Sequence, residues 1–187
     1  MHSDVFGTVL IPSLGNFVYY VSFINDFSRN TWIYFLRKKY KLFDRFKEFK
    51  GLVESKTEKK IKALKTYNGG EFCKKCGIAW QNTTPYTPQQ NEFAKRINKT
   101  LTERARSMLS DGRLGQEFWA EAVDTTCYMV NRSSSSALEN KTPQEVGLIR
   151  NPLFHISGYL DVMHMYMFQR RKEPSCIVNM KGSYYWV

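Results

Sequence analysis

The chain has 187 residues, enough for one globular domain with a proper hydrophobic core. Hydrophobic residues make up 42% and aromatic residues 15%, which excludes an intrinsically disordered chain. The formal net charge of +11 predicts a polyanionic partner, most commonly nucleic acid, although a basic protein without a specific partner has the same charge.

The first part of the chain predicts three strands and a helix. Residues 5–10 and 17–27 are rich in β-branched and aromatic residues, and 31–36 form a third such run after a turn at 28–30. We expect these strands to form an antiparallel meander. An amphipathic helix with lysines on its exposed face should follow, because apolar residues then recur at helical spacing; they are Leu42, Phe46, Phe49 and Val53.

The second part predicts two short strands, at 61–65 and 78–82, and two helices. Asn91 is a good N-cap for the first helix, which runs to about Leu109, and the second spans 116–130. A serine run at 133–136 has the composition of a linker. This order of elements predicts an α/β or α+β domain without choosing between topologies.

The positive charge is concentrated in one segment. Residues 37–65 contain twelve Lys and Arg against four Asp and Glu, a surplus of eight. Four cysteines and the lack of a signal-peptide pattern predict a protein of the nucleus or cytoplasm that is not secreted. No apolar run approaches the ~18 residues that a membrane-spanning helix needs, so we expect no membrane partner.

Two segments carry motifs that point to a family. Residues 65–72 read KTYNGGEF, and residues 84–91 read TPYTPQQN and lead into a basic helix. Residues 25–29 (NDFSR) and 31–36 (TWIYFL) belong to the same pattern. Over residues 2–150 the chain closely resembles the catalytic core of copia-type retrotransposon integrases.

The resemblance implies a fold and a domain organisation. The family's fold is ribonuclease-H-like, an α/β fold in which helices flank a central mixed sheet of about five strands. Residues 1–132 would form the integrase core-like domain, shortened near 72–76. Residues 133–187 would form a linker and a degenerate post-core segment.

The resemblance also maps the family's three metal-binding carboxylate positions onto this chain, at Asp4, Tyr67 and Lys95. Active members of the family use Mg or Mn at these positions for DNA strand transfer. Only Asp4 is retained, because the phenol of Tyr67 is a poor ligand for a hard cation and the ammonium of Lys95 repels one. We therefore expect no cofactor, no metal beyond an Asp4 remnant, and an integrase-family protein that does not catalyse strand transfer.

Few neighbouring side chains could replace the lost carboxylates as metal ligands. Glu92 lies one helical turn before Lys95 and could reach the same region, but Lys95 would then pair with it. Glu71 lies beyond a Gly-Gly turn, and we expect it to be solvated. Cys73 and Cys76 form a C-x-x-C motif without a matching second pair, so we interpret it as a product of the shortened segment and not as a zinc site.

Four basic residues, Lys95, Arg96, Lys99 and Arg104, lie on the polar side of the predicted long helix. In the family this helix faces DNA, so the resemblance implies salt-dependent contacts with phosphates, against the alternative of a merely solvated helix face. It also implies a homodimer, since integrases dimerise.

These observations together identify a degenerate integrase core with residual nucleic-acid binding. A non-functional relic and a co-opted DNA-binding module are the alternatives. An active metal-dependent integrase is a more distant one.

Overall fold

The structure is a computed structural model that describes residues 1–66, 77–82 and 92–147. It contains a five-stranded sheet of order β3-β2-β1-β4-β5. The strands are β1 (His2–Phe6), β2 (Tyr19–Ile24), β3 (Thr31–Leu36), β4 (Ala63–Thr66) and β5 (Ala79–Asn82). β1, β2 and β3 form the predicted antiparallel meander, whereas β4 runs parallel to β1 and β5 parallel to β4. This mixed α/β architecture confirms the predicted fold class.

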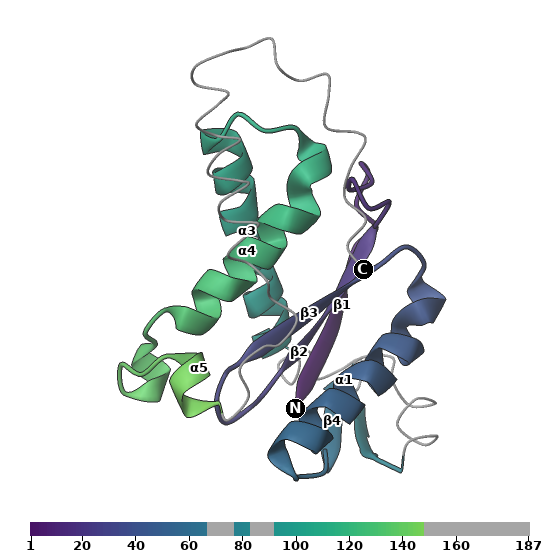
Figure 1. Ribbon diagram of the computed structural model, residues 1–187, viewed down its shortest axis with the longest axis vertical. Coiled ribbons are helices and arrows are strands. Elements are labelled where there is room, and N and C mark those ends of the chain that lie inside the picture. The colour runs from purple at the N-terminus through teal and green to yellow at the C-terminus, as the bar shows by residue number, and fades with distance from the viewer. Residues whose placement is uncertain (67–76, 83–91, 148–187) are drawn as a thin grey trace.

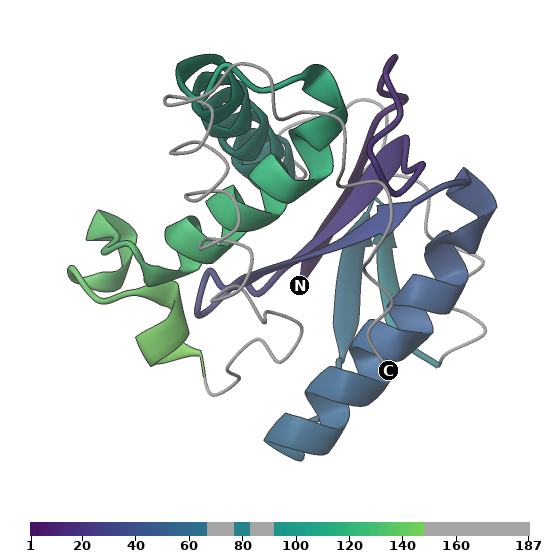
Figure 2. The ribbon, with the colours of Figure 1, turned by 45° about the horizontal axis from the view of Figure 1, so that its top comes forward.

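Helices cover both faces of the sheet (Figures 1 and 2). α1 (Leu42–Thr57) lies on one face, and α3 (Glu92–Asp111) and α4 (Trp119–Arg132) lie together on the other. The shorter elements are η1 (Lys39–Lys41), η3 (Gln116–Phe118), η4 (Ser136–Leu138) and α5 (Pro143–Val146). No described helix is both long and apolar enough to cross a membrane.

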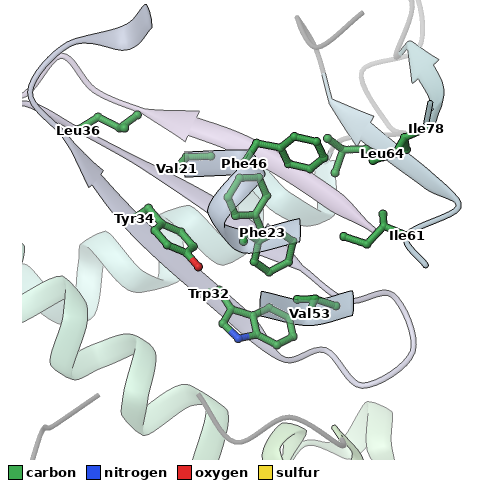
Figure 3. Packing of buried hydrophobic residues seen from close by; sticks show 11 residues of the cluster. Val21, Phe23, Trp32, Tyr34, Leu36, Phe46, Val53, Ile61, Leu64 and Ile78 are labelled. Carbon is green, nitrogen blue, oxygen red and sulfur yellow. The ribbon is translucent and has the colours of Figure 1, made fainter. Parts of the chain in front are cut away.

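The face toward α1 is packed with aromatic rings (Figure 3). Phe23 of β2 stacks on Phe49 of α1 with 4.4 Å between ring centroids, and Trp32 of β3 packs against the same ring. Phe49 is one of the four apolar residues that predicted this helix, and Phe46 and Val53 are buried with it. The amphipathic pattern of α1 is therefore the cause of its docking.

The opposite face forms a second core with α3 and α4. Side chains alternate along a strand, so Tyr20 lies on the face away from Val21 and Phe23. Its ring stacks on Phe6 of β1, with 5.2 Å between centroids, and packs near Leu101 of α3. Because Asp4 and Phe6 are two residues apart on β1, Asp4 also faces α3.

The predicted first strand at 5–10 is wrong in position, because β1 spans His2–Phe6. Gly7 ends the strand with a φ of +124°, a backbone conformation that L side chains rarely adopt. The Val18 carbonyl oxygen and the Tyr19 ring lie within 2.7 Å of where a Cβ would stand. Residues 8–18 consequently form a loop, although their composition favours a strand.

β3 spans the predicted residues, several other boundaries differ by a few residues, and one α-helix was not predicted. β2 is shorter than 17–27, and a turn of 3₁₀ helix, η3, precedes α4. The missed helix is α5, whose start is a capping box: Thr142 Oγ1 accepts from the Glu145 backbone N–H, and the Glu145 carboxylate accepts from the Thr142 N–H. The Thr-Pro-Gln-Glu sequence is a signal for this motif.

Candidate functional site

Asp4 lies in the middle of β1, beneath the first turns of α3. Its antiparallel partner on β2 is Ser22. The carboxylate Oδ2 accepts a hydrogen bond from Nδ2 of Asn98 on α3, at 3.0 Å. The contact joins residues 94 positions apart and fixes the helix over the retained carboxylate.

Burial governs the charge of Asp4. It raises the pKa of the carboxyl above its ordinary value, while hydrogen bonds from Asn98 and from the Val5 backbone act in the opposite direction. The positive charge of Lys95 is the smallest of these influences. Asp4 is thus a partly buried carboxyl held by a neutral amide.

Asn98 is a functional residue that sequence reasoning missed. It is 3% exposed, and its backbone carbonyl accepts from the Thr102 hydroxyl at 2.8 Å and from the Tyr20 hydroxyl at 3.4 Å. Its side-chain oxygen is buried without a hydrogen-bond partner in the described part of the chain. A signal was present, because Asn98 is a polar residue on the buried stripe of α3, between Ala94 and Leu101.

Lys95 has a different environment from the one expected. Its side chain is exposed and forms no ion pair with a described residue. Glu92 is exposed and pairs with Arg96 at 2.8 Å, not with Lys95. The (i, i+4) spacing brings Arg96 to this carboxylate.

Several predicted positions lie outside the described residues: Tyr67, Glu71, Cys73 and Cys76. Among the residues that are described, no three His, Cys, Asp or Glu side chains come together in a way that could hold a metal ion. Asp4 is the one family carboxylate that is retained, and its Oδ2 accepts the Asn98 amide. Within these limits, the donor set does not fit a divalent cation, which needs several anionic oxygens.

A second polar cluster lies at the start of β1. His2 is 7% exposed, and its Nε2 contacts the Asp26 carboxylate. Burial lowers the pKa of His2, although the Asp26 charge acts against this shift. The ring of Phe93 on α3 packs against the His2 ring, with 5.5 Å between centroids, and the Arg29 guanidinium lies 4.4 Å from the centroid of the Phe93 ring. These contacts fix the first turn of α3 beside the sheet.

The basic side chains of α3 lie on two edges of the helix. At 100° per residue, Lys99 and Arg106 lie within about 40° of Lys95, whereas Arg104 lies about 180° from it. All four side chains are exposed. Lys99 faces Glu103 at 3.8 Å, while Lys95, Arg104 and Arg106 form no ion pair with a described residue. Sequence reasoning missed Arg106, which belongs to the Lys95 edge.

Ion pairs neutralise part of the positive surplus of residues 37–65 and leave the rest at its two ends. Four of its cations pair with acids one turn away on α1 or at its start, and they are Lys41, Arg45, Lys47 and Lys50. The other eight form no ion pair with a described residue, and they lie at 37–39 before α1 and at 56–65 toward and beyond its end. The middle of α1 is close to neutral, so its two ends carry the charge.

Similar proteins are found among transposon polyproteins. No family model matches the chain. It is 43% identical over 154 residues to the Retrovirus-related Pol polyprotein from transposon TNT 1-94 of Nicotiana tabacum, covering 78% of this chain and 12% of that protein. It is 32% identical over 149 residues to the polyprotein from transposon RE2 of Arabidopsis thaliana, covering 76% and 10%. The chain thus spans only about a tenth of the length of these relatives.

Solved structures with the same architecture are integrases. The HTLV-2 integrase catalytic core domain in complex with magnesium (trimeric form) superimposes with a TM-score of 0.53 at 15% identity, over 78% of this chain and 93% of that one. The catalytic core domain of BIV integrase gives 0.52 at 15% identity, over 88% and 95%. At this identity the likeness concerns the fold, which is ribonuclease-H-like.

Proposed function

The chain belongs to the copia-type retrotransposon Pol family and has the fold of an integrase catalytic core, and from this premise we propose that it binds duplex DNA without catalysing strand transfer. The proposal concerns the segment of the polyprotein that this chain represents.

The loss of catalysis is inferred from two of the family's three carboxylate positions, where Tyr67 and Lys95 stand in place of acids. Lys95 is exposed and adds a positive charge near Asp4, the one acid that is retained. Active family members would use magnesium or manganese here to polarise a phosphate and activate a nucleophile. The residues described in this chain do not provide the anionic oxygens that such an ion requires.

The exposed cations of α3 favour direct contact with phosphate. Lys95 and Arg106 lie on one edge of α3, both exposed and both without an ion pair to a described residue. Cations of this kind neutralise backbone phosphates and release counterions, which gives affinity with little sequence preference. Because Arg96 and Lys99 lie near acidic partners, we assign them a smaller part.

Fluorescence anisotropy with a labelled duplex tests the binding. Affinity should fall steeply between about 50 and 200 mM salt, as expected for counterion release. The variant Lys95→Gln/Arg106→Gln should weaken binding and reduce the slope of log K against log salt by about 2. The matched control is Arg104→Gln, since Arg104 is also exposed and without an ion pair in the described part but lies on the opposite edge of α3.

Two results would contradict the binding proposal: a flat salt dependence, or an Arg104→Gln variant that weakens binding as much as the double variant. Strand transfer is tested separately, with an oligonucleotide that carries a retrotransposon end. We expect no joined product in magnesium or manganese. A metal-dependent product that disappears in Asp4→Ala would show that the chain is an active integrase.

A further inference from the structure

The loop between β1 and β2 presents three aliphatic side chains to solvent. Leu10 is 97% exposed, Leu14 58% and Ile11 42%. Apolar residues at such exposure are common singly, but three within five residues at one loop form a patch, and such patches mark interaction sites. The patch does not belong to the α3 surface described above, because the loop follows the end of β1 that lies beyond Phe6.

Hydrogen bonds hold this loop in place. The Val9 N–H donates to the Val18 carbonyl at 2.9 Å, and the Ser13 N–H donates to the Phe17 carbonyl at 3.0 Å. η3 and the first residue of α4 also bind the loop. Trp119 Nε1 donates to the Ile11 carbonyl at 3.1 Å, and the Leu14 N–H donates to the Glu117 carbonyl at 3.1 Å. These bonds fix the backbone of the loop in the conformation that exposes its aliphatic side chains.

Positive charge surrounds the same loop. Arg37 Nε donates to the Gly15 carbonyl at 3.1 Å, so the guanidinium is attached to the loop backbone. Lys38 and Lys39 follow it, both exposed and neither in an ion pair with a described residue. This is the N-terminal end of the basic segment, which the acids of α1 leave uncompensated. The patch therefore combines a protruding apolar tip with a fixed guanidinium and two ammonium groups.

We propose that the 8–18 loop is a wedge that enters a groove of duplex DNA, with Leu10 and Leu14 against the bases and Arg37 on a phosphate. Leucine and isoleucine side chains inserted between base steps, with arginine and lysine beside them, are the means by which minor-groove proteins bend DNA. The inference rests on the proposed function, since it requires that the chain bind DNA. It adds a second contact and a deformation of the duplex.

Shape and charge favour DNA over other occupants. A side chain that is 97% exposed protrudes, so a partner must offer a groove to cover it. A second copy of this chain would bring another net charge of +11 to a surface that is already basic. A duplex has the groove, the apolar base edges and the negative charge together.

A duplex of about 30 base pairs with a donor and an acceptor dye at its ends tests the wedge, because bending shortens the distance between the dyes. The full chain should raise energy transfer, and Leu10→Ser/Leu14→Ser should abolish that rise while lowering affinity about fivefold or more. Phe27→Ser is the matched control, since Phe27 is 79% exposed at the opposite end of β2. Thermal melting should show that all these variants fold.

The outcomes separate the wedge from the proposed function. Salt-dependent binding with no change in energy transfer by the wild-type chain would overturn the wedge and leave DNA binding intact. Equal effects of the Leu10/Leu14 and Phe27 variants would overturn it as well. A third result would also overturn the wedge: the Leu10→Ser/Leu14→Ser variant binds and bends DNA normally but, unlike the wild-type chain, does not float with phosphatidylserine vesicles. The patch would then be a membrane contact.

Discussion

Asn98 of α3 binds the retained carboxylate of Asp4. A buried amide that donates to a carboxyl stabilises it by hydrogen bonding, and removing one partner leaves the other polar group buried and unpaired. The Asn98 backbone also accepts from Tyr20 and Thr102, so the amide belongs to a network that links β1, β2 and α3. The retained carboxylate is thus part of the packing between β1 and α3.

We expect Asn98→Ala to lower the free energy of unfolding by about 1 to 3 kcal/mol, the usual penalty for orphaning a buried polar group. Chemical denaturation of four proteins checks it: wild type, Asn98→Ala, Asp4→Ala and the double variant. In the Asp4→Ala background, the second change should be less destabilising, because its partner is already absent. Equal penalties in both backgrounds would show that the two side chains do not interact in solution.

Asp124 of α4 gives the fold a dependence on pH. Burial, together with the nearby charge of Glu121, raises its pKa to about 7. Below pH 4 the carboxyl is protonated in both the folded and the unfolded chain. Between about pH 4 and 7 the folded chain binds more protons than the unfolded one, so stability must fall as the pH rises through this window.

The variant Asp124→Asn should therefore melt at a higher temperature than the wild type at pH 8, by an amount that corresponds to at most about 4 kcal/mol. At pH 4 the two proteins should melt at nearly the same temperature, because the wild-type carboxyl is then neutral. Differential scanning fluorimetry across the range measures the difference. A difference that does not change between pH 4 and 8 would show that Asp124 ionises freely in the folded chain.

At the scale of the elements, the end of β1 depends on one glycine. Gly7 combines a φ of +124° with the close approach of the Val18 carbonyl, and the 8–18 loop begins directly after it. A side chain there would be strained by the backbone conformation and would also collide with β2. The position of the proposed wedge is thus set by the residue that stops the strand.

We expect Gly7→Ala to destabilise the fold by more than about 1 kcal/mol, since both the conformation and the space are unsuitable for a Cβ. Gly51→Ala is the control, because Gly51 lies inside α1 with nothing within 4 Å of the added carbon. That change should stabilise the fold by about 0.5 to 1 kcal/mol through helix propensity. Thermal melts of the two variants should shift in opposite directions; two shifts of the same sign would contradict this account.

The elements that sequence reasoning located well are those with a strong pattern. The helical spacing of Phe46, Phe49 and Val53 predicted α1, and the run at 31–36 predicted β3 to the residue. β1 could not be placed, because the aliphatic residues at 9–11 look like a strand, and only the neighbouring carbonyl of Val18 shows why Gly7 stops it. That contact is tertiary and has no signature in the local sequence.

In the molecule as a whole, the positions of the site residues could be predicted from the sequence, but their partners could not. The resemblance placed Asp4 and Lys95, and the structure puts both at the junction of β1 and α3. The partners could not be predicted: Asp4 binds Asn98, and Glu92 binds Arg96. Which of several nearby polar groups pair depends on distances of a few tenths of an ångström, which a sequence pattern does not fix.

The distribution of positive charge over the molecule could not be predicted from the sequence alone. A surplus of eight within residues 37–65 suggests one continuous basic helix. The ion pairs along α1 leave its two ends positive instead, one beside the 8–18 loop and the other around Lys59, Lys60 and Lys62. The exposed cations therefore gather at the two ends of α1 and along the Lys95 edge of α3.

Manganese binding shows whether the Asp4 carboxylate still belongs to a metal site. Electron paramagnetic resonance of free Mn²⁺ should show the same signal with and without the full chain, at concentrations up to about 1 mM, because Asp4 alone is too weak a donor set. The Asp4→Ala variant should behave identically. Loss of the free Mn²⁺ signal on adding the wild-type chain, restored by Asp4→Ala, would contradict the account.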